Sequence, residues 1–287
     1  MTRILNVLRK TAHISVLMVL VLLVSCARKA REPFSFVQIC DPQLGMGGYE
    51  HDMETFKQAV RQINALGCDF VVICGDLVHH ASDSAFNDFL RIKADLNIPC
   101  YYVPGNHDIG KVPTDTSLAY YRQKLGKDYY AFTHKGYAFI ATNTQLWKAD
   151  VGEESERHEA WFKDTLRALS AGEHPVFVIG HYPFYIKHPE EEEQYSNLPA
   201  EKRKEILALL VDNNVVAYLS GHRHEAIIHN YQGIQLVTGE TTSKNFDKRP
   251  MGFRQWDVSG DTVRHFFVPL EESVSELADS LMAEVIW

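Results

Sequence analysis

Apolar residues in the first half of the chain form short continuous runs separated by longer amphipathic stretches. Three of the runs predict buried β-strands, at residues 34–40, 70–74 and 98–103. Two stretches between them have the apolar spacing of helices, at residues 51–66 and 85–96, with Gly67 as a stop after the first. This alternation of strand and helix predicts βαβ units and an α/β fold with a parallel sheet.

The second half mixes helical spacing with shorter strand-like runs. Helices are predicted at residues 116–125, 154–169 and 200–211. Strands are predicted at residues 129–133, 137–142, 175–179 and 215–219, with a turn at Lys135-Gly136 joining the first two into a hairpin. Three further runs, 226–231, 234–237 and 262–268, predict a meander, and the stretch from Glu271 returns to helical spacing.

The N-terminus has the pattern of an export signal. Three basic residues precede an apolar core at 14–24, which is shorter than the roughly 20 residues that span a bilayer. The core ends in Leu-Val-Ser-Cys, which resembles a bacterial lipobox and implies cleavage before a lipidated Cys26. We expect a signal peptide at 1–25, the lipidated cysteine and a tether at 26–33, and one domain at 34–287. The domain would be exported and held in the bacterial cell envelope by its lipid; an uncleaved N-terminal anchor is the alternative.

The net negative charge of the chain argues against some classes of binding partner. Removal of residues 1–25, which carry three positive and no negative charges, changes the formal net charge from −8 to −11. Sequence-independent nucleic-acid binding needs a basic face, so we expect no nucleic-acid partner, and no obligate protein partner is indicated. The acidic run at 190–193 indicates a solvated loop or helix start.

The four remaining cysteines, Cys40, Cys68, Cys74 and Cys100, lie mostly in or beside apolar runs and are expected to be buried free thiols.

Polar side chains follow five of the predicted strands at the point where each strand ends. They are Asp41 and Gln43; Asp76; Asn106, His107 and Asp108; His181; and His222 and His224. Because strand ends at one edge of a sheet converge, we expect these groups to line one site, with Gly105 turning the chain through a tolerated positive φ. Carboxylate, amide and imidazole ligands together suit Mn²⁺, Fe²⁺ or Zn²⁺, and the set is large enough for two ions that share a carboxylate.

In their order along the chain, these clusters resemble the motifs of the calcineurin-like metallophosphoesterases. The family pattern D-x-H, G-D, G-N-H-[DE], a lone His and G-H-x-H is matched by D-P-Q at 41–43, G-D at 75–76, G-N-H-D at 105–108, His181 and G-H-R-H at 221–224. The D-P-Q form, with Gly45 nearby, is also similar to the subgroup that contains the animal calcineurin-like phosphoesterase-domain Ser/Thr phosphatase. The resemblance implies a four-layer α/β/β/α sandwich of two mixed sheets.

The resemblance also implies a role for each residue. The first metal would be held by Asp41, Asp76 and His224, with Gln43 where the family usually has His. The second metal would share Asp76 and be held also by Asn106, His181 and His222. A hydroxide between the metals would attack phosphorus, and His107, oriented by Asp108, would protonate the leaving oxygen or steady the transition state. The implied activity is hydrolysis of a phosphomonoester or phosphodiester, in a phosphorylated small molecule or a phosphoprotein.

Several residues keep more than one interpretation. Gln43 could be a weak oxygen ligand, a group that supports a ligand, or a spectator. Arg223 either points away or meets a phosphate, and Tyr182 either forms an aromatic wall for the leaving group or packs in the core. Three further histidines are expected to face solvent: His51, His79 and His80. The alternative function is a non-catalytic surface module for binding or scaffolding that retains the fold; the missing first-motif His supports it, and intact His107 and Asp108 oppose it.

Overall fold

The computed structural model describes residues 31–270 of the chain. The chain divides into Met1–Glu32 and Pro33–Trp287, and the fold described below belongs to the second unit. The predicted signal peptide at 1–25, the predicted lipidation site Cys26 and the helical pattern from Glu271 lie outside the described residues. Within residues 31–270, every helix is too short or too polar to cross a bilayer.

The first sheet has the strand order β11-β10-β1-β2-β3. Its strands are β1 (Phe34–Ile39), β2 (Phe70–Ile73), β3 (Cys100–Tyr102), β10 (Gly252–Ser259) and β11 (Thr262–Pro269). β1, β2 and β3 run parallel, which confirms the predicted βαβ units, and β10 joins β1 antiparallel. The sequence pattern missed β10, whose buried Arg254 interrupts its apolar alternation. The predicted meander is wrong in its third strand, because β11 pairs with β10 in this sheet.

The second sheet has the strand order β4-β5-β6-β7-β9-β8. Its strands are β4 (Tyr130–His134), β5 (Tyr137–Ala141), β6 (Val176–Ile179), β7 (Val215–Ser220), β8 (Ile227–Tyr231) and β9 (Ile234–Thr238). The four central strands are parallel, and β4 and β8 pair antiparallel at the two edges. The predicted β4–β5 hairpin is confirmed, and Lys135 and Gly136 in its turn have φ values of 45° and 83°, as a type I′ turn requires.

Five helices of ordinary length connect the strands, and two single-turn helices lie near the strand ends. The long helices are α2 (Tyr49–Leu66), α3 (Asp83–Lys93), α5 (Asp115–Leu125), α7 (Glu153–Ala171) and α8 (Ala200–Asp212). Gly67 ends α2 in the left-handed conformation, and Ser82 caps α3 by accepting the backbone N–H of Ala85. The short helices α4 (Asn106–Ile109) and α6 (Gln145–Lys148) were not predicted, because four residues carry no helical periodicity.

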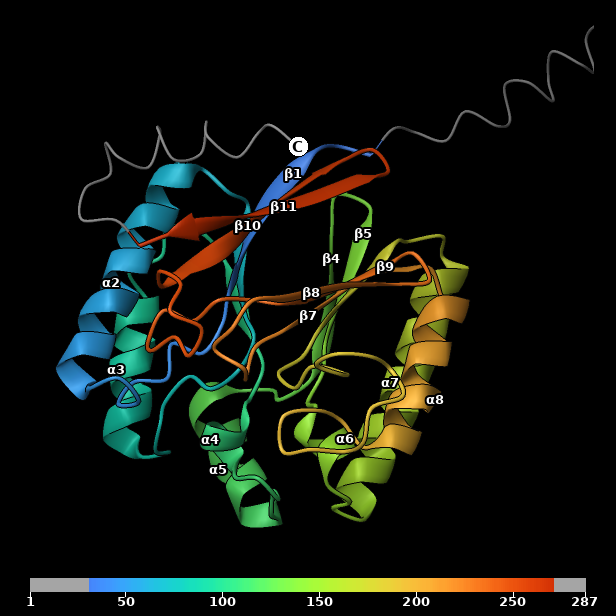
Figure 1. Ribbon diagram of the computed structural model, residues 1–287, viewed down its shortest axis with the longest axis horizontal. Helices are drawn as coiled ribbons and strands as arrows, with labels where there is room; N and C mark the ends of the chain where they lie inside the picture. The colour runs from blue at the N-terminus through green and yellow to red at the C-terminus, as the bar shows by residue number, and fades with distance from the viewer. Residues whose placement is uncertain (1–30, 271–287) are drawn as a thin grey trace, which may run out of the picture. The chain divides into compact units, whose positions relative to one another are not determined.

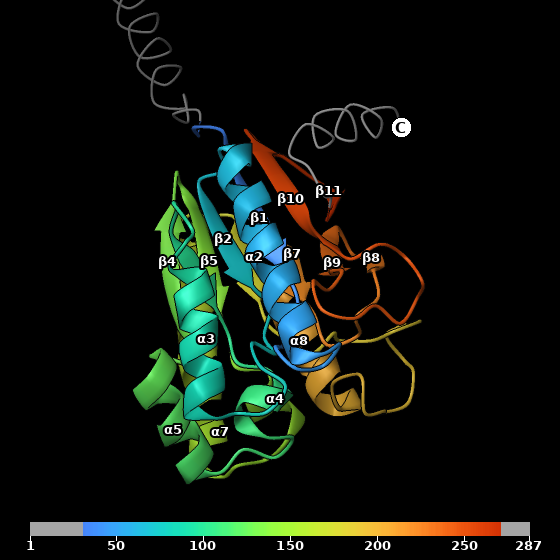
Figure 2. The same ribbon diagram turned by 90° about the vertical axis from the view of Figure 1, so that its left-hand side faces the viewer.

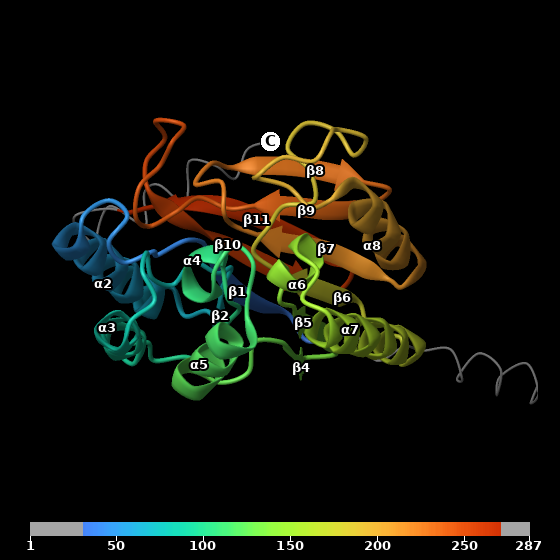
Figure 3. The same cartoon turned by 90° about the horizontal axis from the view of Figure 1, so that it is seen from below.

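The elements stack as helices, sheet, sheet and helices (Figures 1 and 3). α2 and α3 lie over the outer face of the first sheet (Figure 2), and α7 and α8 lie on the opposite side, over the second. Three apolar clusters fill the spaces between the four layers, and they contain Phe56, Phe139 and Phe162 respectively. The expected α/β/β/α sandwich of two mixed sheets is therefore confirmed.

Gln38 is a polar residue buried between the two sheets. Its Oε1 accepts the Trp256 indole N–H at 3.0 Å, and its Nε2 donates to the carbonyls of Ser220 at 3.1 Å and Val237 at 3.2 Å. A buried amide with its hydrogen bonds made avoids the cost of an unpaired polar group. Because it joins β1 to β7 and β9, Gln38 fixes how the strand ends of the two sheets align.

Candidate metal centre

The polar residues predicted at five strand ends meet where strands from both sheets end side by side. The first sheet supplies the residues after β1, β2 and β3, and the second sheet supplies those after β6 and β7. The expectation that one sheet edge carries them all is therefore wrong. The two sets are joined directly, because the carboxylate of Asp41 accepts the backbone N–H of His222 at 2.9 Å. The single turn α4, which carries Asn106 to Ile109, lies below these strand ends in Figure 1.

Four residues, which we call the His181 group, converge on one point: Asp76, Asn106, His181 and His222. The Nε2 atom of His181 lies 3.4 Å from Asp76 Oδ2, 3.1 Å from Asn106 Oδ1 and 3.2 Å from His222 Nδ1. Ligand atoms of Asp76, His181 and His222 all lie within 4.8 Å of one another. The other ring nitrogen of His181, Nδ1, is 2.8 Å from the Cys74 carbonyl, which can only accept, so Nδ1 carries a proton and Nε2 is the ring nitrogen that a metal ion would use.

Three further residues, which we call the Asp41 group, lie beside it: Asp41, Gln43 and His224. His224 Nε2 is 3.8 Å from Asp41 Oδ1, and its Nδ1 donates to the Lys244 carbonyl at 2.7 Å. Gln43 Nε2 donates to His79 Nδ1 at 3.3 Å. The Oε1 of Gln43 is buried and has no hydrogen-bond partner among the described residues. A buried acceptor without a partner costs about 1–3 kcal/mol, so a cation at this point would give it one.

The backbone is strained at most of the candidate ligands. Five of the seven have positive φ: Asp41 (48°), Gln43 (32°), Asp76 (47°), His222 (72°) and His224 (52°). Each such conformation costs on the order of 1–3 kcal/mol outside glycine and persists only where the surroundings enforce it. At Asp41 the Thr241 hydroxyl donates to the main-chain carbonyl at 2.8 Å. Strain of this kind gathers at functional sites, and nothing in the apolar pattern of the chain predicts it.

Two motif glycines are required by close packing against the carboxylates. A Cβ atom on Gly105 would lie 2.1 Å from Asp76 Oδ1, and one on Gly221 would lie 2.5 Å from Asp41 Oδ2. The expected positive φ at Gly105 is wrong, because φ is −109° there. These glycines therefore act by letting a neighbouring loop approach a ligand carboxylate, and any larger side chain would displace that carboxylate.

His107 lies beside the His181 group. Its backbone N–H donates to Asp76 Oδ1 at 2.8 Å, and its ring Nδ1 donates to the His79 carbonyl at 2.8 Å. The expectation that Asp108 orients this ring is wrong. The Asp108 carboxylate instead accepts backbone N–H groups from Gly105 and from the two residues after Asp76. Asp108 thus ties the second motif to the third and positions His107 through the backbone.

His79 is the residue that the sequence analysis most clearly misplaced. It was expected to face solvent, but it is partly buried, stacks on the His107 ring at 4.7 Å and accepts the Gln43 amide. Its place three residues after Asp76 in the same loop is the signal that could have found it. Thr144 carries no such signal, although its hydroxyl accepts the backbone N–H of His181 at 3.2 Å. The solvent exposure expected of the other two histidines, His51 and His80, is confirmed.

Opposite charges stabilise one another in this centre. Burial raises the pKa of Asp41 to about 6. Burial acts in the same direction on Asp76, but the charge of His181 outweighs it, and the pKa of Asp76 falls below its usual range. For His181 burial would lower the pKa, yet Asp76 and Asp41 raise it to about 9. Burial lowers the pKa of His222. The centre therefore favours a positive charge among its carboxylates, which a bound cation supplies in place of protons.

The model of the calcineurin-like phosphoesterase family matches residues 34–226, well over half of the chain and all five motifs. This chain belongs to that family. It is a metal-dependent phosphoesterase, a hydrolase that acts on phosphate ester bonds with divalent metal ions. The residues fit this cofactor, because the two groups offer converging carboxylate, amide and imidazole atoms and an orphaned buried oxygen.

Similar proteins include the animal subgroup that the D-P-Q motif indicated. The chain is 32% identical over 266 residues to the serine/threonine-protein phosphatase CPPED1 of Danio rerio, covering 84% of this chain and 86% of that protein. It is 27% identical over 278 residues to the Homo sapiens protein of the same name, with coverages of 87% and 88%. It is 24% identical over 237 residues to the 3′,5′-cyclic adenosine monophosphate phosphodiesterase CpdA of Haemophilus influenzae, with coverages of 76% and 80%.

Two solved structures share the fold of this phosphoesterase at low sequence identity. A dimetal phosphatase from Danio rerio has a TM-score of 0.62 and 16% identity, and the match covers 84% of this chain and 100% of that one. GAP50, described as the anchor in the inner membrane complex of Plasmodium, has a TM-score of 0.62 and 18% identity, with coverages of 85% and 86%. At these identities, both likenesses show the fold alone.

Hydrogen bonds from Lys148 hold the loop between β6 and α8 beside the His181 group of the phosphoesterase. Lys148 on α6 donates to the carbonyls of Gln194 at 2.7 Å and Asn197 at 2.8 Å. The acidic run at 190–193 was expected to be solvated, and this is wrong for Glu191. That side chain is buried and accepts backbone N–H groups within the loop, because these turns leave donors that need a partner.

The two residues predicted to meet substrate have other contacts in the structure. Arg223 donates to the Ser196 hydroxyl at 2.8 Å and to Glu225 at 3.0 Å, so it fastens the loop, and a phosphate contact stays a prediction. Tyr182 is 1% exposed, and its ring lies 4.3 Å from the His222 ring within the core of the second sheet. The structure therefore favours core packing over an aromatic wall for Tyr182.

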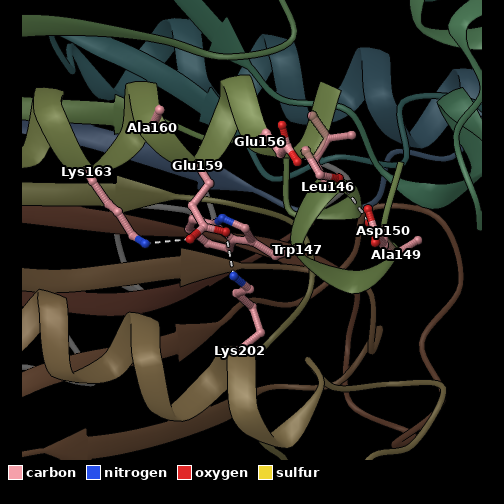
Figure 4. Close-up of a pocket in the computed structure, with 10 residues that line it drawn as sticks. Leu146, Trp147, Ala149, Asp150, Glu156, Glu159, Ala160, Lys163 and Lys202 are labelled. Carbon is pink, nitrogen blue, oxygen red and sulfur yellow. Dashed lines mark hydrogen bonds and ion pairs between the residues drawn. The ribbon is translucent and has the colours of Figure 1, made fainter. Parts of the chain in front are cut away.

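A cavity of about 590 Å³ lies among α6, α7 and α8 and is lined by none of the candidate ligands (Figure 4). Its two lysines are paired, because Glu159 accepts hydrogen bonds at 2.5 Å from both Lys163 and Lys202, and two further carboxylates, Asp150 and Glu156, also line it. Partial burial would raise the pKa of Glu159, but the two lysines lower it to about 2. The chemistry of the phosphoesterase belongs to the metal centre and not to this cavity.

Proposed function

We propose that this phosphoesterase is an exported, lipid-anchored enzyme whose centre holds two divalent transition-metal ions and hydrolyses a phosphomonoester or phosphodiester. The observation that carries the proposal is the convergence of the His181 group, with ligand atoms within 4.8 Å of one another, beside the Asp41 group. The two groups adjoin one another, because His181 Nδ1 lies 3.8 Å from Asp41 Oδ1 while its Nε2 lies 3.4 Å from Asp76 Oδ2, and Asp76 is proposed as the carboxylate that the two ions share. The mixture of oxygen and imidazole nitrogen atoms favours Mn²⁺, Fe²⁺ or Zn²⁺ over Ca²⁺.

The residues of the chain would divide the work of hydrolysis. The ions, when bound, activate water and neutralise charge on the phosphate. His107 keeps its Nδ1 proton on the His79 carbonyl, so its Nε2 is the atom that faces the reaction. In the imidazolium form, Nε2 gives its proton to the leaving alkoxide as the P–O bond breaks, and neutral imidazole remains. Asp108 maintains this geometry by holding the loop backbones together.

The class of substrate is open between small phosphate esters and phosphoproteins. The CPPED1 relatives are named as serine/threonine-protein phosphatases, which supports a phosphoprotein, and CpdA is named for a cyclic nucleotide diester. The formal charge of −8 opposes nucleic acid as a substrate.

The export proposal rests on the basic and apolar N-terminal pattern and on Cys26. Mass analysis of the mature N-terminus tests it, since the lipoprotein route gives a diacylated or triacylated Cys26. Cys26→Ser should leave the fold unchanged and remove the acyl mass. An unmodified N-terminus that begins at Met1 would contradict export by this route.

The catalytic proposal is tested by elemental analysis after metal loading, together with phosphate release from a chromogenic phosphate ester. We expect about two ions per chain and turnover that depends on added Mn²⁺ or a similar ion. The alternative is a surface scaffold, which the replacement of the first-motif His by Gln43 favours and for which GAP50 offers a precedent of fold. A chain that takes up metal only in traces and releases no phosphate would support the scaffold.

A further inference from the structure

Two exposed aromatic rings lie directly on candidate metal ligands. Among the described residues, only a few large hydrophobic side chains are exposed, and two of these are Phe246 (50%) and Tyr195 (51%). The Phe246 ring stacks on the His224 ring, with centroids 4.8 Å apart and planes within 12°. The Tyr195 ring is tilted against the His222 ring at 5.0 Å. Solvent-exposed apolar rings that adjoin a reactive centre are typical of ligand recognition.

Phe246 is held in place before any ligand arrives. Its backbone N–H donates to the His224 carbonyl at 3.3 Å, and His224 Nδ1 donates back to the Lys244 carbonyl at 2.7 Å. The Asn245 side chain closes the same loop by donating to the carbonyls of Arg249 and Pro250 at 2.7 Å each. These contacts hold the loop, and stacking on His224 holds the ring, so the ring loses little conformational entropy when another ring stacks on it.

The two sides of the centre present different surfaces. On the His222 side, the Lys111 ammonium lies 4.8 Å from the Tyr195 ring centroid, and Asn106 donates to the Tyr195 hydroxyl at 3.3 Å. On the other side, within the described part of the chain, Phe246 stacks on His224 alone and keeps half of its surface open. Phe246 is therefore the better platform for a flat group, and Tyr195 is covered by a cation.

The loop of Phe246 is also positively charged in an acidic protein. Lys244 and Lys248 flank the ring in sequence and are exposed, while the formal net charge of the chain is −8. A local cationic rim concentrates anionic ligands near a site even where the whole protein is acidic. An anionic substrate that carries a flat ring meets both features of this loop.

We propose that Phe246 is a stacking platform for a planar aromatic ring in the leaving group of the substrate. The phosphoesterase then prefers esters such as nucleotides or aryl phosphates over aliphatic phosphates of equal charge. The proposal rests on the proposed function, because the ring is recognised while the phosphate occupies the metal centre. Phe246 lies close to the metal centre, because its ring stacks on His224 and the Nε2 of His224 lies 3.8 Å from Asp41 Oδ1.

The test compares adenosine 5′-monophosphate with ribose 5-phosphate on the metal-loaded protein. Both esters are cleaved at the primary C5 oxygen of a ribose, and they differ at C1, which carries adenine in one and a hydroxyl in the other. Stacking of a base on an aromatic side chain predicts a preference for the nucleotide of about 5- to 150-fold in kcat/KM. Phe246→Ala should collapse this ratio towards 1, and Phe246→Leu, which keeps an apolar side chain against His224 without a flat face, should also lower it.

The ratio of the two substrates separates recognition from damage to the metal centre, because a weakened centre lowers both values together. Ile228→Ala is the matched control, since Ile228 is an exposed apolar residue (52%) on the edge strand β8 and should leave the ratio unchanged. If the wild-type protein hydrolyses both esters equally, or if Phe246→Ala keeps the preference, the platform is wrong while the proposed function stands. If neither ester nor a chromogenic ester is hydrolysed, the proposed function itself fails.

The aromatic ring could belong to a nucleotide base or to a phosphotyrosine, and a second experiment distinguishes these two substrates. Phosphotyrosine and phosphoserine peptides of otherwise identical sequence are compared in wild type and Phe246→Ala. A loss confined to the phosphotyrosine peptide identifies an aryl phosphate as the substrate class. A loss confined to adenosine 5′-monophosphate identifies a nucleotide.

Discussion

The two groups of candidate ligands differ in how closely their atoms approach one another and in how many of them have hydrogen-bond partners. In the His181 group, the central imidazole is fully buried, donates to the Cys74 carbonyl and faces an oxygen or nitrogen atom of each other member within 3.4 Å. In the Asp41 group, His224 is 3.8 Å from Asp41, and the Oε1 of Gln43 is buried without a hydrogen-bond partner among residues 31–270, while its amide nitrogen donates to the partly exposed His79. For the two-ion centre proposed above, we infer that the His181 group holds one ion tightly and the Asp41 group holds the other loosely.

The difference follows from one substitution within the motif. An imidazole gives a borderline metal a strong nitrogen ligand, whereas an amide gives a harder and weaker oxygen. The motif resemblance places a His where this chain has Gln43, and the other six candidate ligands match the motifs. Loading of the two ions in two steps is therefore expected.

The largest effect is expected from His107, which contacts Asp76 through its backbone but is not a candidate ligand. His107→Ala should lower kcat by roughly 10²–10⁴, the usual contribution of a positioned acid, and leave metal content unchanged. Phosphate release and elemental analysis of the same samples check both parts. Esters with good leaving groups should lose less, because they need no proton. An equal loss for all leaving groups would show that His107 acts on transition-state charge instead.

The next effect sets the two groups directly against each other. His181→Ala should weaken binding of the tighter ion by more than about 100-fold, the upper range for loss of a residue that merely supports a ligand. Gln43→Ala should weaken only the looser ion, and by less. Equilibrium dialysis with elemental analysis measures both, and circular dichroism establishes that each variant is folded. Comparable losses in the two variants would remove the distinction between the groups.

Gln43→His should bring the looser site towards the tighter one. We expect a gain of about 1–3 kcal/mol in binding of the first ion, on the scale of hydrogen bonds to charged groups. Pro42 restricts the local backbone, so the ring has to fit the φ of 32° that Gln43 adopts. Calorimetric titration of both proteins provides the check. A wild-type protein that loads both ions at one affinity, with no change in Gln43→His, contradicts the two-step model.

Much of the fold was predictable because apolar runs and helical spacing are local signals. The parallel core β1-β2-β3, the β4–β5 hairpin and the helix end at Gly67 were all predicted from such patterns. The partners of β11 were not, because pairing to β10 depends on contacts far along the chain. Polar residues inside β10 and the four-residue lengths of α4 and α6 left no periodicity to detect.

In the candidate site, too, local features were predictable from the sequence and contacts between distant segments were not. Residue types and their order along the chain predicted the seven candidate ligand residues, but the sequence could not show that two sheets supply them. Nor could it show which donors the Asp108 carboxylate accepts, since those are backbone groups and backbone donors are the same in every residue. Phe246 was missed for a similar reason: only the folded chain brings it onto His224.

The smallest effect is expected from His79, which acts on the looser site through Gln43. Its Nδ1 accepts the Gln43 amide at 3.3 Å and so fixes the orientation of that amide, while its ring stacks on His107. Loss of a group that orients a metal ligand lowers metal affinity by about 10- to 100-fold. We expect the lower end of that range here, because the amide of Gln43 is a weak ligand.

His79→Phe keeps the stacked ring and removes the acceptor, so it should weaken binding of the first ion. His79→Asn keeps an acceptor near the Nδ1 position and should restore the affinity. The bond from His107 to the residue 79 carbonyl survives both changes, so the comparison isolates the amide contact. Titration of the first ion, followed by a Gln43→Ala/His79→Phe double variant, completes the test. Additive losses in that double variant would mean that His79 does not act through Gln43.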